Sequence, residues 1–141
     1  ESPRAAGQNR LESTPESDER TEGKGADHSI ARRYLEELPA TRLGLPLVRD
    51  GAEPVWHLFV VQSAQRDAVR AALERDGIET MVHYPTPPHL QPCYSDLGYP
   101  PGSFPITERL HRDCISLPLN PALSDDEVRH TIAACRRAAP A

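Results

Sequence analysis

The sequence predicts a small α/β domain over residues 29–139, in which helices pack against a short three-stranded sheet. Three observations lead to this prediction. Runs of β-branched and aromatic residues at 55–62, 78–83 and 115–117 have the composition and length of short strands. Segments with apolar residues at helical spacing alternate with these runs. The 141 residues of the chain are the length of one domain with a short tail.

Residues 1–28 are predicted to form a disordered or irregular tail. Leu11 is their only large apolar side chain, and a segment that buries so little apolar surface cannot offset the entropy lost on ordering. Order is predicted to begin with a short helix that Ser29 caps and Pro39 ends. Its apolar face consists of Ile30, Tyr34, Leu35 and Leu38. Residues 43–48 then form an edge segment, where a proline is tolerated.

The next three elements form a strand–helix–strand unit. Residues 55–62 are a buried strand, and Ser63 caps a helix over 64–76 that Gly77 ends. Residues 78–83 alternate in polarity as a second strand, which completes a split βαβ-type unit. The helix is expected to turn three apolar side chains inward: Val69, Ala72 and Leu73.

A long proline-rich loop over 84–105 follows this unit. Seven of the 15 prolines of the chain lie in it, and a segment so poor in backbone donors is neither a helix nor a central strand. A short helix over 106–113 leads to the third strand at 115–117. Ser124 and Glu127 then form a capping box that opens the last helix.

The composition excludes several classes of partner. The chain carries 16 Lys and Arg against 21 Asp and Glu, whereas binders of nucleic acids and acidic membranes present basic surfaces. No apolar run approaches the ~20 residues of a membrane span, and no signal peptide opens the sequence. The three cysteines, Cys93, Cys114 and Cys135, are too few for a disulfide scaffold and predict reduced thiols. We therefore expect a cytoplasmic protein without nucleic-acid or membrane partners.

Polar side chains concentrate at residues 83–94, directly after a predicted strand. Six of them lie within this stretch among four prolines: His83, Tyr84, His89, Gln91, Cys93 and Tyr94. Loops held on a rigid scaffold are where binding residues tend to lie, and proline reduces the entropy lost when such a surface is ordered. We expect His83, Tyr84 and His89 to be the binding residues of this loop.

Two other chemistries are open to the same loop. A zinc site would use His83, His89 and Cys93 with His111 or Cys114 as a further ligand, but this spacing matches no common zinc framework. A nucleophilic Cys93–histidine pair lacks a third orienting group and an oxyanion site. His111 itself is expected to be a solvated helix residue. No metal ligand and no catalytic residue is therefore assigned.

Four segments of the chain resemble the carboxy-terminal part of the DegT/DnrJ/StrS sugar aminotransferases. The family pattern is H-x-F/Y in a strand, then H-Y-P-x-P-x-H-x-Q, F-P-x-x-E and L-S-L-P-x-x-P. Here the motifs read HLF, HYPTPPHLQ, FPITE and ISLPLNP, at residues 57–59, 83–91, 104–108 and 115–121. Each motif alone is short, but their shared order makes the resemblance specific.

The resemblance implies a role for the chain. Family members are homodimers of fold type I that depend on pyridoxal phosphate and move an amino group from glutamate or glutamine to a nucleotide-linked keto sugar. The chain would be the small domain, a carboxy-terminal fragment that covers the last third of such an enzyme. His83 and Tyr84 would donate hydrogen bonds to the sugar or the diphosphate, and His89 would complete this substrate-binding set by ordering the loop.

The resemblance also implies that most of the chemistry lies outside this chain. The family's cofactor-binding lysine lies upstream of every matched motif, and the only lysine here, Lys24, lies in a polar stretch where it would stay solvated and protonated. We therefore expect this chain alone to bind no pyridoxal phosphate and to be inactive as a transaminase. Residues 7–11, GQNRL, are similar to the family's G-x-N-x-R-L with one residue missing, which would place Asn9 at the cofactor phosphate of the partner subunit.

Two alternatives to the aminotransferase fragment follow from the same residues. The chain would act as an interaction module if it pairs with a separate large-domain polypeptide or with a full-length aminotransferase. It would act as a small zinc-binding domain if the histidines and cysteines of the loop share a metal ion, and chelators should then unfold it.

Overall fold

The computed structural model describes the backbone of residues 17–141 and the side chains from residue 25 onward. Helices and strands are both present, which confirms the mixed class. The elements are, in chain order, α1 (Ser17–Glu37), β1 (Phe59–Gln62), α2 (Arg66–Arg75), the 3₁₀ helices η1 (Pro88–Leu90) and η2 (Pro92–Leu97), α3 (Pro105–Asp113), β2 (Cys114–Leu117) and α4 (Asp125–Ala138).

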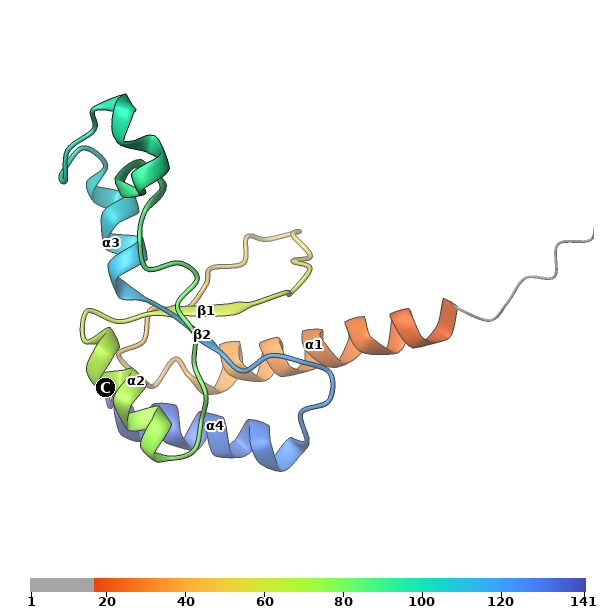
Figure 1. The fold of residues 1–141 in the computed structure, drawn as a ribbon. Helices are drawn as coiled ribbons and strands as arrows, with labels where there is room; N and C mark the ends of the chain where they lie inside the picture. Colours follow the sequence, from red (N-terminus) through yellow and green to blue (C-terminus); the bar gives the residue numbers. More distant parts are fainter. Residues whose placement is uncertain (1–16) are drawn as a thin grey trace, which may run out of the picture.

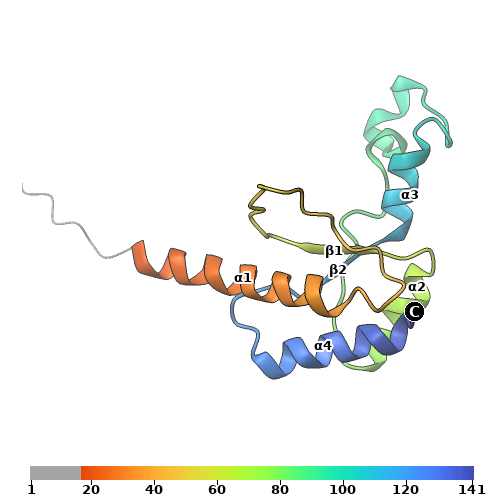
Figure 2. The same cartoon turned by 180° about the vertical axis from the view of Figure 1, so that it is seen from behind.

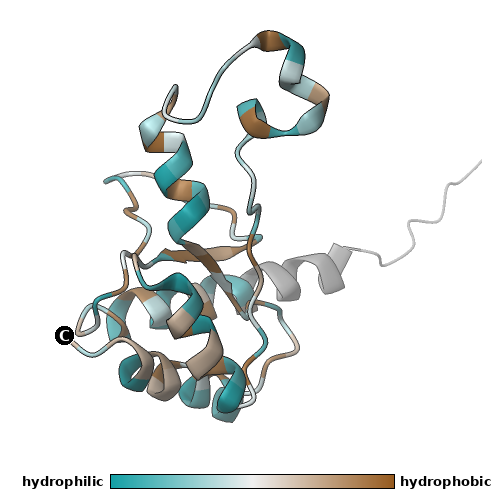
Figure 3. Ribbon diagram, turned by 60° about the vertical axis from the view of Figure 1, so that its left-hand side comes forward, coloured by the Kyte–Doolittle hydropathy of each residue, from teal (hydrophilic) through white to brown (hydrophobic). Residues whose placement is uncertain are grey.

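The elements divide into a helical layer and a projecting arm. Helices α1, α2 and α4 lie together on one side of the two strands (Figures 1 and 2). The segment 84–113, which contains η1, η2 and α3 and is called the arm below, extends away on the other side (Figure 1). Brown, apolar ribbon is concentrated in the strands between the two parts, with further apolar positions along the arm (Figure 3).

The core lies between the strands and the helical layer. Strands β1 and β2 pair antiparallel, with Phe59 opposite Leu117 and Val61 opposite Ile115. These four side chains share a buried cluster with Leu38, which directly follows α1, and with residues of the three helices: Ile30, Tyr34, Val69, Leu73, Val128, Ile132 and Cys135. Burying each large apolar side chain contributes about 1.5–3 kcal/mol, so this cluster supplies the main stabilisation of the domain.

Tyr34 joins helix α1 to both strands. Its ring lies 5.0 Å from the ring of Phe59, and its hydroxyl donates a 2.8 Å hydrogen bond to the Pro118 carbonyl. Burial raises the pKa of this hydroxyl, so it remains a neutral donor. The predicted apolar face of this helix is therefore confirmed by its contacts.

The predicted three-stranded sheet is wrong, because the sheet has two strands. In the predicted strand 78–83 only Met81 pairs with β2, through an isolated bridge to Ser116. The Ile78 N–H instead donates to the Leu73 carbonyl at the end of α2, and the Arg70 side chain contacts Thr80. Helix α2 therefore holds the start of this segment, which leaves a single residue in register with the sheet.

Several predicted boundaries also differ. Helix α2 spans Arg66–Arg75 instead of 64–76, with Gln65 and not Ser63 at its N-cap, and the predicted loop over 84–105 contains η1 and η2. Strand β1 begins at Phe59 instead of residue 55, because Phe59 pairs with Leu117 and the next partner in β2 would be Pro118, which has no N–H to donate. Helix α1 begins at Ser17 instead of Ser29. The rest of the predicted tail, residues 1–16, lies outside the described residues.

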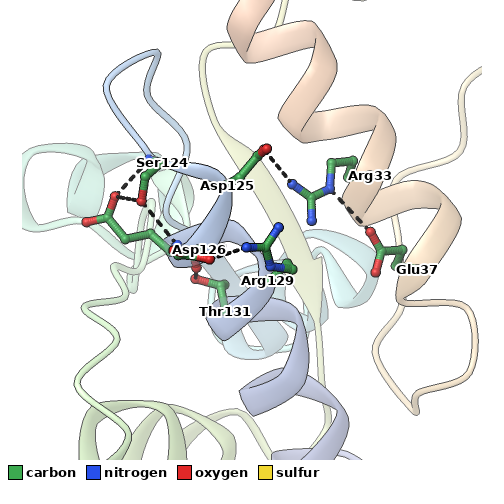
Figure 4. A network of polar contacts seen from close by, with 8 residues as sticks. Arg33, Glu37, Ser124, Asp125, Asp126, Arg129 and Thr131 are labelled. Atoms are coloured by element: carbon green, nitrogen blue, oxygen red, sulfur yellow. Dashed lines mark hydrogen bonds and ion pairs between the residues drawn. The ribbon is translucent and has the colours of Figure 1, made fainter.

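The last helix begins as the sequence predicts. Ser124 Oγ accepts a 3.3 Å bond from the Glu127 N–H, and Glu127 Oε2 accepts a 2.8 Å bond from the Ser124 N–H, which confirms the capping box (Figure 4). Arg33 of α1 bridges to this helix, with Asp125 at 3.1 Å and Glu37 of its own helix at 3.3 Å (Figure 4). Such exposed ion pairs add little to the free energy of unfolding, so the apolar core supplies most of the stability of this helix packing.

Candidate functional site

The candidate site lies on the outer face of the two strands, opposite the core. Successive strand residues point to opposite faces, so Ile115 and Leu117 enter the core while Cys114 and Ser116 face outward. Their partners across the sheet are Gln62 and Val60. This outer face and the root of the arm enclose a shallow pocket of about 220 Å³, lined by Val60, Gln62, His83, Leu110, His111 and Cys114.

His83 lies between this pocket and a second one. Its Nδ1 is 2.8 Å from the hydroxyl of Ser116, a buried residue of β2. The second pocket, of about 300 Å³, is also lined by His83 and is bordered by Glu79, Met81 and residues 116–120. Nε2 of His83 has no hydrogen-bond partner among the described residues. The ring is therefore fixed through one nitrogen and offers the other to a ligand.

Tyr84 is held through its backbone and presents its ring to the surroundings. Its carbonyl accepts a 2.6 Å hydrogen bond from Nδ1 of His111, at the end of α3. Its side chain is 66% exposed, and its ring meets that of His83 edge to face at 5.5 Å. The two predicted binding residues are therefore adjacent, and α3 and β2 each fasten one of them.

A further pocket, of about 500 Å³, opens on the outer side of Tyr84. It is lined by Tyr84, Pro85, Thr86, Gln91, Pro92 and Cys93. The thiol of Cys93 is exposed and lies 3.9 Å from the Gln91 side-chain oxygen. No histidine lines this pocket, so the structure does not bring Cys93 together with a base.

His89 is held within the arm instead of facing a pocket. Its Nε2 is 3.0 Å from Oε1 of Glu108, and its side chain is only 7% exposed. Glu108 also accepts hydrogen bonds from the N–H groups of Gly102, at 2.8 and 2.9 Å, and Phe104, at 3.2 Å. The Gly102 N–H, then those of Phe104 and His89, hold the pKa of this carboxyl below its usual range.

Aromatic contacts complete this bracing of the arm. The ring of Phe104 packs edge to face against His89 at 4.9 Å and against Tyr99 at 5.1 Å. The residues from 89 to 108 therefore close on themselves around one carboxylate, and His89 has little surface left for a ligand.

Three residues of this site were missed as functional by sequence reasoning. Glu108 and Ser116 lie inside the F-P-x-x-E and L-S-L-P motifs. The motifs therefore mark both residues, but they do not show which side chains these residues contact. His111 was expected to be solvated, yet it is half-buried and bonded to the Tyr84 carbonyl. Each partnership depends on how distant segments meet, and the sequence does not show this. Asn9, the candidate for the cofactor phosphate, lies outside the described residues.

In the part of the chain that the structure describes, histidines, cysteines and acidic residues form no group of three that could hold a metal ion. None of its helices combines the length and the apolar character needed to cross a bilayer.

The match to known proteins extends over nearly the whole chain. The model of the DegT/DnrJ/EryC1/StrS aminotransferase family matches residues 5–136. This chain belongs to that family. The erythromycin biosynthesis sensory transduction protein EryC1 of Saccharopolyspora erythraea is 42% identical over 112 residues, which are 79% of this chain and 31% of that protein. The dTDP-3-amino-3,4,6-trideoxy-α-D-glucose transaminase of Streptomyces venezuelae is 39% identical over 113 residues, 79% of this chain and 30% of the relative.

Solved structures of the aminotransferase family share the fold. The crystal structure of S. venezuelae DesV in complex with a ketimine intermediate is similar with a TM-score of 0.80 and 37% identity, over 83% of this chain and 32% of DesV. A family member from Brucella abortus is similar with a TM-score of 0.74 and 32% identity, over 82% of this chain and 31% of its own. The chain thus spans about a third of the length of the aminotransferases it matches.

The aminotransferase family depends on pyridoxal phosphate, a cofactor whose aldehyde is held by a lysine. Residues 25–141, whose side chains the structure describes, contain no lysine, and Lys24 is the only lysine of the chain. The described residues therefore do not fit this cofactor.

Proposed function

We propose that this chain is the carboxy-terminal, small-domain part of a pyridoxal-phosphate-dependent nucleotide-sugar aminotransferase and supplies residues that bind the sugar nucleotide. The observation that carries the proposal is the pairing of His83 and Tyr84 at the root of the arm. The Ser116 hydroxyl holds the His83 ring, and His111 holds the Tyr84 carbonyl. His83 Nε2 and the Tyr84 hydroxyl have no hydrogen-bond partner among the described residues. The Streptomyces venezuelae relative is a transaminase of a dTDP-linked sugar, which supports a nucleotide-linked keto sugar as the ligand.

Each residue of the predicted binding set has a distinct role in this proposal. His83 and Tyr84 hydrogen-bond to the sugar or the diphosphate. His89 orders the arm through Glu108, so its contribution to binding is indirect. A rigid arm keeps the first two side chains in place before the ligand arrives, which reduces the entropy lost on binding.

The cofactor and the transfer of the amino group from glutamate or glutamine belong, in this proposal, to the part of the enzyme that carries the family's lysine. We expect this chain by itself to bind no pyridoxal phosphate and to transfer no amino group. We also propose a cytoplasmic location, because Cys93, Cys114 and Cys135 are free thiols.

We propose that the chain contacts the cofactor-bearing part of the enzyme, in a homodimer or with a large-domain polypeptide. The arm supports such a contact, because it exposes large apolar side chains away from the core: Tyr84 66%, Tyr94 46%, Leu97 61%, Ile106 68% and Leu110 39%. Exposed apolar side chains grouped in this way mark contact surfaces. Co-purification of a pyridoxal-phosphate protein with the chain would identify such a partner.

A hybrid enzyme tests the proposed function. This chain replaces the matching third of the Streptomyces venezuelae transaminase, and amino transfer to its dTDP-linked sugar is measured. We expect an active hybrid in which His83→Ala raises the sugar-nucleotide KM, while the control His28→Ala, an exposed residue of α1, does not. A folded, cofactor-loaded hybrid whose KM is unchanged by His83→Ala would contradict the proposal.

A further inference from the structure

Ser116 and His83 form a hydrogen bond whose direction the surroundings decide. Ser116 lies in β2, is 5% exposed, and has its hydroxyl oxygen 2.8 Å from Nδ1 of His83. Among the described residues, this nitrogen is the one hydrogen-bond partner of the hydroxyl. The backbone N–H and carbonyl of Ser116 are both paired with Met81.

Only one of the two directions pairs the hydroxyl hydrogen with an acceptor among the described residues. If Nδ1 of His83 carried the proton, it would donate to the Ser116 oxygen, and the hydroxyl hydrogen would find no acceptor in the described part of the chain. A buried donor without a partner is costly, whereas the opposite direction satisfies both groups. The Ser116 hydroxyl therefore donates to Nδ1, and the neutral ring carries its proton on Nε2.

We infer that Ser116 is a positioning residue that fixes His83 as an Nε2–H donor toward the pockets on the outer face of the sheet. The inference rests on the proposed binding role of His83 and deepens it by naming the chemistry recognised. A fixed N–H donor selects an oxygen acceptor, namely a hydroxyl or carbonyl oxygen of the sugar or an oxygen of the diphosphate. It does not select an amino group.

Neighbouring histidines provide references for this tautomer within the same protein. His111 Nδ1 lies 2.6 Å from the Tyr84 carbonyl, which can only accept, so His111 carries its proton on Nδ1. His130 Nε2 lies 2.8 Å from the Asp76 carbonyl, so His130 carries its proton on Nε2. His83 is expected to match His130 and to differ from His111.

Nitrogen NMR of the full chain, labelled with ¹⁵N on histidine and kept in mildly alkaline buffer, reads the tautomers without any ligand. The expected result is Nε2–H at His83 and His130 and Nδ1–H at His111. A proton on Nδ1 of His83 would overturn the inference and would leave the hybrid-enzyme test of the proposed function unaffected.

Two variants test whether Ser116 is the residue responsible. Ser116→Ala should move the Nδ1 signal of His83 downfield, toward that of an unpartnered nitrogen. The control Thr131→Ala removes another buried hydroxyl, on α4, and should leave the signal unchanged. A His83 spectrum identical in Ser116→Ala and the unmodified chain would contradict the positioning role.

Two probes distinguish the sources of the acceptor oxygen. Inorganic pyrophosphate supplies phosphate oxygens, and glucose supplies sugar hydroxyls. A shift of the His83 Nε2–H signal with pyrophosphate supports a diphosphate contact, and a shift with glucose supports a sugar contact. No shift with either probe would overturn the assignment of an oxygen acceptor to this donor.

Discussion

One motif contains two histidines, one at the root of the arm and one in its interior, and the two have different partners. His83, at the root, is bonded through Nδ1 to a neutral hydroxyl and keeps Nε2 free. His89, in the interior of the arm, is bonded to a carboxylate that two backbone N–H groups also hold, and its side chain is 7% exposed. The comparison teaches that the partner of a histidine, more than its position in a motif, decides whether the ring keeps a nitrogen free or braces the fold.

The same contrast holds for the residues that support each histidine. Ser116 belongs to a sheet that the core keeps rigid, so it fixes one ring without closing over it. Glu108 belongs to α3, and its carboxylate accepts hydrogen bonds from the Gly102 and Phe104 N–H groups. This carboxylate therefore holds the arm in its folded shape. Substitutions at the root of the arm should therefore weaken ligand binding, and substitutions in its interior should open the arm.

The largest effect is expected for Glu108→Ala, which removes the shared acceptor of Gly102, Phe104 and His89. The arm should open while the helical layer keeps its fold, because the core contains no residue of the arm. Limited proteolysis should cleave the arm faster, on the order of tenfold, since the half-buried His89 ring and the Gly102 and Phe104 N–H groups lose their shared acceptor. The matched control Asp126→Ala, an exposed acid of α4, should leave the cleavage rate unchanged, and equal rates in both variants would contradict the bracing role.

The next effect concerns ligand binding at the root. In the hybrid enzyme His83→Ala should raise the sugar-nucleotide KM about tenfold, which corresponds to one net hydrogen bond. Cleavage of the arm by protease should stay as in the unmodified chain. An arm that opens in His83→Ala would show that His83 also braces the fold, and the contrast with His89 would then fail.

A smaller effect is expected from acid. Because the pKa of Glu108 lies below its usual range in the folded arm, its stabilising contribution is complete above the usual pKa and is lost as the pH falls through the lowered value. The ring signals of Tyr99 and Phe104 should broaden as the pH is lowered below about 4, near the ordinary carboxyl range. Glu108→Gln should show no such acid transition, and a transition of the same size in that variant would assign it to another group.

The smallest effect is expected at Lys24. Lys24→Arg should leave the activity of the hybrid unchanged, because the cofactor is proposed to be held by a lysine of the other part. Treatment of the unmodified chain with pyridoxal phosphate and borohydride, followed by mass spectrometry, should give no saturable adduct. A saturable adduct confined to Lys24 would show a cofactor site in this chain itself.

Local patterns in the sequence predicted the elements whose causes are local. The capping box at Ser124 and the strand around Ile115 are found where they were expected. The predicted third strand does not form, because the Ile78 N–H donates to the Leu73 carbonyl at the end of α2. Alternating polarity in the sequence does not reveal this tertiary competition.

The candidate site was predicted only as a set of residue types. Its partnerships join residues 33 positions apart for His83 and Ser116, 27 for Tyr84 and His111, and 19 for His89 and Glu108. Such pairings depend on strand register and on where α3 meets the sheet, and neither is encoded in a single motif. The free nitrogen of His83 therefore became visible only in the folded chain.

One titration tests the difference between His83, at the root of the arm, and His89, in its interior, most directly. Thymidine diphosphate is added to the ¹⁵N-histidine-labelled full chain, and the ring signals of His83 and His89 are followed together. The account predicts a saturable shift at His83 and none at His89. A shift at His89 with none at His83 would contradict it, since the ligand would then bind at the residue that Glu108 holds within the arm.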